Sequence, residues 1–565
     1  METVTENIWQ KIASPEPTAG IDGRLVFDKN RSRYLHKGFW AGMYEEVRDL
    51  KFTLQKEPQS QGDMFLFPHS HKGSRFTFAH PSVSEGDFLV QCFKEKVDPF
   101  VKILHKPTLQ LELNHFRRGI LSDPVEFQCR LVAVYALALL PMCSMIVEHR
   151  YHEPKDAMVA RYRSYVEQGL SQLNLTTTQS VSTLQTFLLY ITLLFWTGEM
   201  LHASTLLSVA LAMARRMGLN HDGTHFALSP WQIELRRRLW HHLVLLDAWC
   251  VENHGVQPLI RSGDYDTSLP LNQDDSAWDT SEFSSQQPQV RNNFTDTTIA
   301  LMQYEFGALT KSILDHPYRP SMTVRSYLDL HNEMLRQAHD RLEILYLRGL
   351  DTEHNILHHL AKDLFDHAFR RLRLMQLQPV VNAKSNIEEA QRAGLEAKMY
   401  QLAIEYCKTT HNLITFYTPY NLDWTIIRAF SWHSVATMLS MVLRHEALSN
   451  TPEARAARTR IEQLFQNRPS IDYLAGNDNL WEPLRMLRAE LAVRQALPVR
   501  TPQSGIGAEG EMVQGLRTSD PGTEGSGDFV SMTSTSIDPA LFGLAGHEDM
   551  VGMASGQWAD FDAYM

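Results

Sequence analysis

Cysteine is scarce in this chain, and its spacing excludes two kinds of site. Only five cysteines occur in 565 residues, and no two of them stand three positions apart. A disulfide framework or a thiolate zinc cluster needs closely spaced pairs, so the sequence predicts neither. We interpret the cysteines as reduced, mostly buried side chains of an intracellular protein. They are Cys92, Cys129, Cys143, Cys250 and Cys407.

Long apolar runs are also missing, although 43% of the residues are hydrophobic. The two longest candidates, residues 131–147 and 184–196, fall short of the about 20 apolar residues that a membrane span needs, and the first contains Pro141. The N-terminus lacks the basic start and apolar core of a secretory signal. We therefore expect no membrane association, and we predict that both runs are helices buried in a large all-α core.

No part of the chain carries the basic excess that a nucleic-acid interface needs. The net charge is −11, from 54 basic and 65 acidic residues. Residues 501–565 contain ten acidic residues and a single arginine, so the remainder of the chain is close to neutral. A DNA-binding surface gathers lysine and arginine on one face, and this balance gives no sign of one.

Motifs of enzymes and metal sites are absent from the sequence as well. It holds neither a phosphate-binding GxxxxGK[ST] loop nor a GxSxG nucleophile turn. Residues 505–510 fit GxGxxG, but no strand precedes them, so we regard that match as chance. His354 and His358 could share a helix face and bind a metal. With His359 and His367 nearby, surface histidines are the favoured interpretation. We predict no enzyme, and no catalytic, metal or cofactor-binding residue.

What the sequence does contain is helical periodicity. From Glu85 onward apolar residues recur at three- and four-residue spacing, and the alternation typical of strands is nearly absent. We therefore predict an all-α fold. The predicted helices cover about 85–98, 107–121, 124–148, 155–174, 180–197, 200–217, 229–252, 296–315, 321–347, 351–376, 387–418, 422–447 and 452–466.

Composition divides the chain into three segments. Residues 1–83 form an N-terminal segment that we expect to be disordered at its start and to contain one amphipathic helix in its second half. Residues 84–496 form the helical domain, with a polar break at 276–292. Residues 497–565 are rich in glycine, serine, threonine and acids and cannot bury enough apolar surface to offset the entropy of ordering. We predict a disordered acidic tail there. The amphipathic positions are Phe39, Trp40, Met43, Val47 and Leu50.

The helix predicted at 229–252 places a carboxylate beside its apolar stripe. Asp247 lies four residues after Leu243, on the edge of a row of leucines. An isolated buried charge is costly, so Asp247 needs a partner. Arg215, Arg216 or Arg238 could supply it.

The same helix carries three arginines in a row, followed by Trp240. Successive helical residues are about 100° apart, so Arg236, Arg237 and Arg238 fan out around the helix. They cannot all face one phosphate track. Ion pairs between helices are the favoured interpretation, over contact with nucleic acid.

Three segments share their residues, in order, with one known protein family. Residues 97–108 (VDPFVKILHKPT) are similar to the pattern HPxFxx(L/I)HxP(T/S), with Asp98 where histidine is usual, and residues 182–186 (STLQT) match a helix start. Residues 204–275 combine a small-residue helix ending at Gly218, the three-arginine helix and a loop closing on Pro270. About residues 24–275 thus resemble the middle homology region of fungal transcription regulators of the binuclear zinc-cluster (Zn2Cys6) class. The regulatory-motif residues that this resemblance singles out are Pro99, His105, Pro107, Gly218, Leu219, Asp222, Gly223, Arg236, Arg237, Arg238, Trp240, Asp247 and Pro270.

The DNA-reading part of that family is missing from this sequence. The resemblance implies six cysteines in two close sets, a basic linker and a short coiled coil ahead of the middle region, and none of these occurs. The module is either absent from the gene product or lost to a misplaced start, and the sequence does not choose between them. No cofactor is evident, and zinc is expected only if such an N-terminal cluster exists.

The acidic tail contains two short segments in which aromatic residues alternate with acids, DPALFGL at 538–544 and WADFDAY at 558–564. Acidic neighbours keep such side chains exposed, free to dock as a short helix into a coactivator groove. We predict an activation segment, with a plain disordered tail as the alternative. Its apolar residues are Leu541, Phe542, Leu544, Trp558, Phe561 and Tyr564.

The resemblance implies a nuclear regulator of transcription in a fungus, an activator of a metabolic or secondary-metabolite gene cluster. Two alternatives stay open: a coregulator without a DNA module that pairs with a full-length relative, and a repurposed protein that binds or converts a small molecule. The expected partners are the transcription machinery or a coactivator through the tail, and a homodimer or heterodimer partner. Promoter DNA is a direct partner only if an upstream module exists, and otherwise an indirect one.

Overall fold

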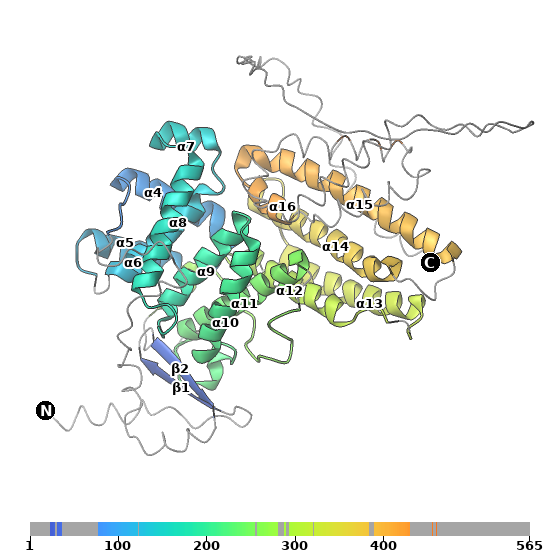
Figure 1. Ribbon diagram of the computed structural model, residues 1–565, viewed down its shortest axis with the longest axis horizontal. Helices are drawn as coiled ribbons and strands as arrows, with labels where there is room; N and C mark the ends of the chain where they lie inside the picture. Colours follow the sequence, from blue (N-terminus) through green and yellow to red (C-terminus); the bar gives the residue numbers. More distant parts are fainter. Residues whose placement is uncertain are drawn as a thin grey trace, which may run out of the picture. The chain divides into compact units, whose positions relative to one another are not determined.

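Most of the described chain is helical (Figure 1). The computed structural model describes residues 23–28, 31–36, 77–121, 124–254, 257–280, 287–289, 293–319, 321–382 and 389–429, with 452, 455 and 459. All of them lie in the first of the chain's two units, residues 1–498. The predicted all-α fold is confirmed for this part of the chain. Its longer helices are α4 (Val83–Cys92), α5 (Lys106–Arg117), α6 (Pro124–Leu139), α7 (Ser144–Tyr151), α8 (Lys155–Gln172), α9 (Val181–Trp196), α10 (Met200–Arg216), α11 (Pro230–His254), α12 (Thr298–Asp315), α13 (Val324–Leu342), α14 (Ile356–Asn382), α15 (Glu389–Tyr417) and α16 (Asp423–Ala429).

Short helical turns of other kinds extend or connect these helices. The π-helical turns η2 (Phe93–Val97) and η5 (Glu343–Leu347) continue α4 and α13. The 3-10 turns are η3 (Gly223–His225), η4 (Asp275–Ala277) and η6 (Thr418–Tyr420). The predicted helices 85–98 and 321–347 are therefore each one uninterrupted helix whose last five residues are π-helical. The predicted helix at 452–466 lies almost entirely outside the described residues.

One predicted helix is two helices in the structure. We predict a single helix over 124–148, whereas α6 and α7 are separated by a break that contains Pro141. Proline has no amide hydrogen and its ring clashes with the carbonyl four residues earlier. The buried Lys155 Nζ donates to the carbonyl oxygens of Leu140 at 3.0 Å and Met142 at 2.7 Å, and so partners the backbone where α6 ends.

A β-hairpin precedes the helices, and the sequence pattern did not predict it. Strand β1 (Gly23–Asp28) pairs antiparallel with β2 (Arg31–His36), with Gly23 opposite His36 and Asp28 opposite Arg31. Strand β2 lies against α10. Each strand has six residues, too few for alternation to stand out beside long helical patterns. The amphipathic helix predicted around Phe39 to Leu50 lies outside the described residues.

Helix α9 is the centre of the core. All 16 of its residues are buried, which confirms that the apolar run 184–196 is an internal helix. It packs against α6, α8, α10 and α11. Further along the chain α11 packs on α12, α12 on α14, α14 on α15, and α15 on α16. Among the described helices, none combines the length and the hydropathy that crossing a membrane requires.

The five cysteines are free thiols in this fold. Cys129, Cys250 and Cys407 are buried and Cys92 is half-buried, as we expected. Cys143 is exposed, because it lies in the break between α6 and α7 where the chain reaches the surface.

Candidate functional site

Three consecutive arginines on α11 each hold a different segment of the chain. Arg236 Nη2 donates to the carbonyl oxygen of Met217, at the end of α10, over 2.5 Å. Arg237 forms two hydrogen bonds of 2.8 Å with the carboxylate of Asp222. Arg238 donates to Glu234, one turn earlier, and to Asp275, each at 2.8 Å. The helical fan thus directs three charges to three neighbours, inside the protein.

Arg238 belongs to a buried group of charges that we call the Asp275 cluster. Asp275 accepts from Arg238 at 2.8 Å, from Lys102 Nζ at 2.8 Å and from the backbone amide of Lys106 at 3.0 Å. Lys102 also contacts Asp98 at 2.5 Å. Each of these side chains except that of Lys106, which contributes its backbone, is at most 1% exposed. The members are Asp98, Lys102, Glu234, Arg238 and Asp275.

The cluster joins three segments that are far apart in the sequence. Asp98 and Lys102 lie in the turn after η2, Glu234 and Arg238 on α11, and Asp275 in the loop that follows α11. Glu234 also accepts from the backbone amide of Leu271 in that loop, at 3.0 Å. The contacts therefore fix the 98–106 turn and the 271–275 loop against one face of the helix.

Three carboxylates and two cations give the Asp275 cluster an excess of negative charge. Burial alone would raise the pKa of Asp275, but Arg238 and Lys102 hold it well below its usual range. Burial raises the pKa of Asp98 to about 6; Lys102 opposes this rise and Asp275 adds to it. One Asp98 carboxylate oxygen, Oδ1, has no hydrogen-bond partner within the described structure. Protonation of Asp98 would therefore remove the excess negative charge of the cluster.

This geometry predicts a pH-dependent effect of Asp98→Asn. A folded-state pKa of about 6, above the ordinary 3.8, favours the protonated carboxyl in the folded protein. That contribution is present below pH 3.8 and is lost as the pH rises through about 6. We expect the free energy of unfolding of Asp98→Asn, measured by urea denaturation, to improve relative to wild type as the pH rises across this window. An unchanged or falling difference would contradict the assignment. Asp329→Asn, at an aspartate that is 61% exposed, controls for loss of a surface carboxylate.

The motif residues 97–108 shape the turn that presents Asp98 and Lys102. His105 precedes α5, and its Nδ1 accepts from the amide of Thr108 at 3.3 Å. Its Nε2 therefore carries the hydrogen and donates to the carbonyl oxygen of Asp275 at 2.8 Å. Burial lowers the pKa of His105, which favours this neutral form. Pro107 occupies the first turn of α5, where a missing amide hydrogen costs nothing.

Residues 218–223 connect α10 to α11 through a left-handed turn. Gly218 has φ of 71°, a conformation that glycine adopts without strain. The amide of Leu219 donates back to Ala214 at 2.9 Å, which closes the end of α10. Burial alone would raise the pKa of Asp222, but bonds from Arg237, Thr224 and Ser268 together lower it well below its usual range.

Three other motif residues lie on α11 or in the segments on either side of it. A Cβ added at Gly223 would lie 3.0 Å from the Cα of Ile233, so the link passes close to α11. Trp240 is completely buried and its ring centroid lies 5.5 Å from that of Tyr265. Pro270 is buried in the loop that leads to Asp275.

Asp247 has a partner that we did not predict. We expect Arg215, Arg216 or Arg238, whereas Lys311 of α12 contacts the carboxylate at 2.5 Å. The amides of Leu259 at 3.0 Å and Ile260 at 3.1 Å complete its bonds. The arginines are used elsewhere, since Arg215 pairs with Asp264, Arg216 binds carbonyl oxygens and Arg238 lies in the Asp275 cluster. Only tertiary packing brings α12 beside this turn of α11.

Comparison with known proteins identifies the region that contains these contacts. A family model described as the fungal specific transcription factor domain matches residues 90–343. Over residues 90–343 this chain is similar to the fungal specific transcription factor domain. The domain includes every motif residue described above and the whole Asp275 cluster, and α14, α15 and α16 lie beyond its matched limit.

Relatives of the domain are named as regulators of transcription. The C6 finger domain transcription factor hasF of Aspergillus fumigatus is 28% identical over 343 residues, which are 54% of this chain and 45% of that protein. The Aurofusarin cluster transcription factor aurR2 of Gibberella zeae is 24% identical over 80% of this chain and 67% of its own length. The Pyriculol/pyriculariol biosynthesis cluster transcription factor 1 of Pyricularia oryzae is 23% identical over 46% of this chain and 37% of its own length. The chain spans about half the length of the relatives it matches.

The histidines considered as metal ligands do not come together in this fold. His354 is 80% exposed, whereas His367 is completely buried on α14, so the expectation of surface histidines is wrong for His367. The described residues contain no group of three or more histidine, cysteine, aspartate or glutamate side chains placed to hold a metal. The six apolar residues of the predicted activation segment lie outside the described part of the chain.

The contacts of the Asp275 cluster hold the 98–106 turn and the 271–275 loop to α11. Its cations face carboxylates at hydrogen-bond distance, and the neighbouring His105 is held neutral between backbone partners. Sequence reasoning missed Lys102 and Lys311, the cations that complete the two buried pairs. The spacing of Asp98 and Lys102, one helical turn apart, was the available signal for the first. No local signal pointed to the second.

Proposed function

We propose that this chain regulates transcription, as an activator of genes for a metabolic or secondary-metabolite pathway in a fungus. The match of residues 90–343 to the fungal specific transcription factor domain carries this proposal. Relatives named for the aurofusarin and pyriculol clusters support the kind of target. The buried ion pairs of the Asp275 cluster suit a scaffold that relays a signal, and we assign the protein a nuclear location and no catalytic role.

Transcript levels after deletion of the gene test the proposal. We expect mRNA of the co-regulated pathway genes to fall and to recover when the gene is restored. Unchanged mRNA together with loss of the pathway product would contradict it. That result would favour the alternative in which the helical body binds or converts a small molecule.

The route to DNA is a separate part of the proposal. The 565 residues hold no two-set, six-cysteine pattern, so promoter contact has to come from a segment outside this sequence or from a paired zinc-cluster protein. Purified chain without affinity for promoter DNA that co-purifies with a zinc-cluster protein would support the second route. An in-frame upstream segment with paired cysteines, found by mapping the 5′ end of the transcript, would support the first.

Activation is expected to depend on the aromatic residues of the tail. The full chain, fused to an unrelated DNA-binding domain, should activate a reporter, and Phe542→Ala, Trp558→Ala and Phe561→Ala together should lower that activity. A drop of roughly tenfold is expected, because an aromatic anchor in a groove contributes at least about 1.4 kcal/mol.

A matched control for this experiment replaces three apolar tail residues outside the two aromatic segments, Val513, Leu516 and Val530, with alanine. These changes should leave activation unchanged at equal protein level. Equal activity of the two triple variants would remove the tail from the mechanism.

A further inference from the structure

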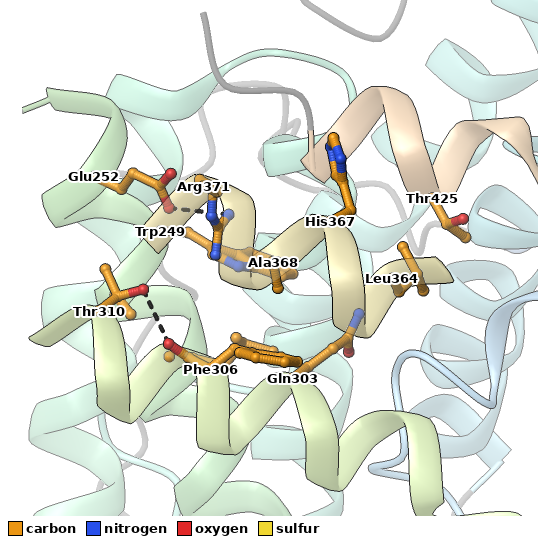
Figure 2. A pocket seen from close by; sticks show the side chains of 13 residues that line it. Trp249, Glu252, Gln303, Phe306, Thr310, Leu364, His367, Ala368, Arg371 and Thr425 are labelled. Atoms are coloured by element: carbon orange, nitrogen blue, oxygen red, sulfur yellow. Dashed lines mark hydrogen bonds and ion pairs between the residues drawn. The ribbon is translucent and has the colours of Figure 1, made fainter. Parts of the chain in front are cut away.

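A small cavity lies between α11, α12, α14 and α16, away from the Asp275 cluster (Figure 2). Its volume is about 90 Å³. Apolar walls come from Trp249 of α11, Phe306 of α12 and Leu364 of α14. The family match ends at residue 343, so two of the four helices that form the cavity belong to the matched domain and two lie beyond it.

Polar atoms without protein partners line this cavity. The Gln303 side chain reaches from α12 toward α14 in Figure 2, and its Oε1 is buried with no hydrogen-bond partner in the described structure. The same holds for Nε of Arg371 and Nδ1 of His367, both on α14. Buried polar atoms in native proteins nearly always have a partner. The two that face this cavity, Gln303 Oε1 and Arg371 Nε, therefore indicate a guest that supplies those partners.

The hydrogen-bonding character of His367 follows from its neighbours. The Thr410 hydroxyl donates its hydrogen to the carbonyl oxygen of Tyr406 at 2.8 Å, so at 3.3 Å from His367 Nε2 it acts as acceptor. The hydrogen of the neutral imidazole is then on Nε2, and Nδ1 is an acceptor. Burial, with Arg371 and Arg370, lowers the pKa of His367 to about 3, which keeps the ring neutral. The His367 ring itself stacks on Tyr406 of α15 and points away from Gln303 and Arg371 in Figure 2. The cavity therefore offers one acceptor, Gln303 Oε1, and one donor, Arg371 Nε.

Charge and size limit the guest further. Arg371 pairs with Glu252 at 3.2 Å, and both side chains are 14% exposed, so their charges cancel at the side that reaches solvent. An uncharged guest matches this lining. An engineered cavity of about 150 Å³ holds benzene, so about 90 Å³ limits the buried part of a guest to roughly four non-hydrogen atoms.

We propose that this cavity is a binding site for an uncharged alcohol, with about three carbons of its apolar body buried against Trp249, Phe306 and Leu364. The hydroxyl group both donates and accepts: it donates to Gln303 Oε1 and accepts from Arg371 Nε. The site stands independently of the proposed function, because it rests on the cavity and its unpartnered atoms. If the chain regulates transcription, a bound alcohol would contact both the matched region, through α11 and α12, and the helices beyond it, α14 and α16.

A matched pair of probes tests the site on the full chain. We expect 2-butanol, which donates and accepts, to bind more tightly than 2-butanone, which only accepts. The expected ratio is about three- to tenfold, the effect of one hydrogen bond. Ligand-observed saturation-transfer NMR gives both dissociation constants. Failure of both probes to bind would mean that the cavity holds water only, and equal affinities would show that its polar atoms do not recognise the hydroxyl group; either result overturns the proposal.

Two variants locate binding in the cavity. Gln303→Met keeps the side-chain volume but removes the amide acceptor, so the preference for 2-butanol should shrink while 2-butanone binding stays. Ala368→Leu fills the cavity from α14 and should abolish binding of both probes. Gln401→Met and Ala393→Leu, at exposed positions of α15, are the matched controls and should bind as wild type does. Wild-type binding by Ala368→Leu, with native helical content by circular dichroism, would place the probes elsewhere.

Discussion

Arg238→Met is expected to be the most destabilising of the substitutions considered for this protein. It leaves Glu234 and Asp275, each 1% exposed, without the cation that faces both, and only Lys102 remains to neutralise Asp275 and Asp98. Breaking a buried ion pair from one side costs about 3–5 kcal/mol, a large part of the about 5–15 kcal/mol by which proteins are stable. Urea unfolding followed by circular dichroism measures the loss.

The control for Arg238→Met is Arg336→Met on α13. Arg336 also contacts two carboxylates, Glu333 at 2.7 Å and Asp340 at 3.1 Å, but it is 58% exposed. Exposed pairs contribute up to about 1 kcal/mol, so this variant should unfold close to wild type. Similar unfolding midpoints for the two variants would show that burial of the Asp275 cluster does not govern its energetics.

Lys311→Met has the second largest expected effect, and it is local. Asp247 keeps its bonds from the amides of Leu259 and Ile260 but loses its buried counter-ion. We expect a loss of about 3 kcal/mol and faster cleavage by trypsin after the exposed Arg261, because Asp247 holds this loop to α11.

Lys362→Met on α14 is the matched control, since Lys362 pairs with Asp366 one turn away and is 41% exposed. It should leave both the unfolding midpoint and the cleavage rate after Arg261 unchanged. A Lys311→Met protein that unfolds earlier without faster cleavage at this site would contradict the role assigned to Asp247 in holding the loop.

The helices could be predicted because their signal is local. The apolar spacing of α8, α9, α10 and α12 sets their bounds within a few residues, and the motif at 97–108 marks the start of α5 at Pro107. The break between α6 and α7 could have been predicted as well. Pro141 was visible in the sequence, but the apolar residues on both sides of it read as one run.

The charged contacts could be predicted only in part. That the arginines of α11 serve ion pairs inside the protein follows from the angle between successive residues. Which carboxylate each one meets does not, because Asp275 lies 37 residues after Arg238 and Lys311 lies 64 residues after Asp247. The cavity could not be predicted from the sequence at all, because its volume depends on how four helices pack together.

The Asp275 cluster also has a consequence for the way this domain opens. Charges from the 98–106 turn, α11 and the loop at Asp275 are paired with one another, so moving any one segment away leaves buried charge without its partner on the other two. Segments coupled in this way should exchange their amide hydrogens as one cooperative unit, at one free energy of opening. Loss of either cation, Lys102 or Arg238, is then tolerated only together with loss of a carboxylate that it pairs with.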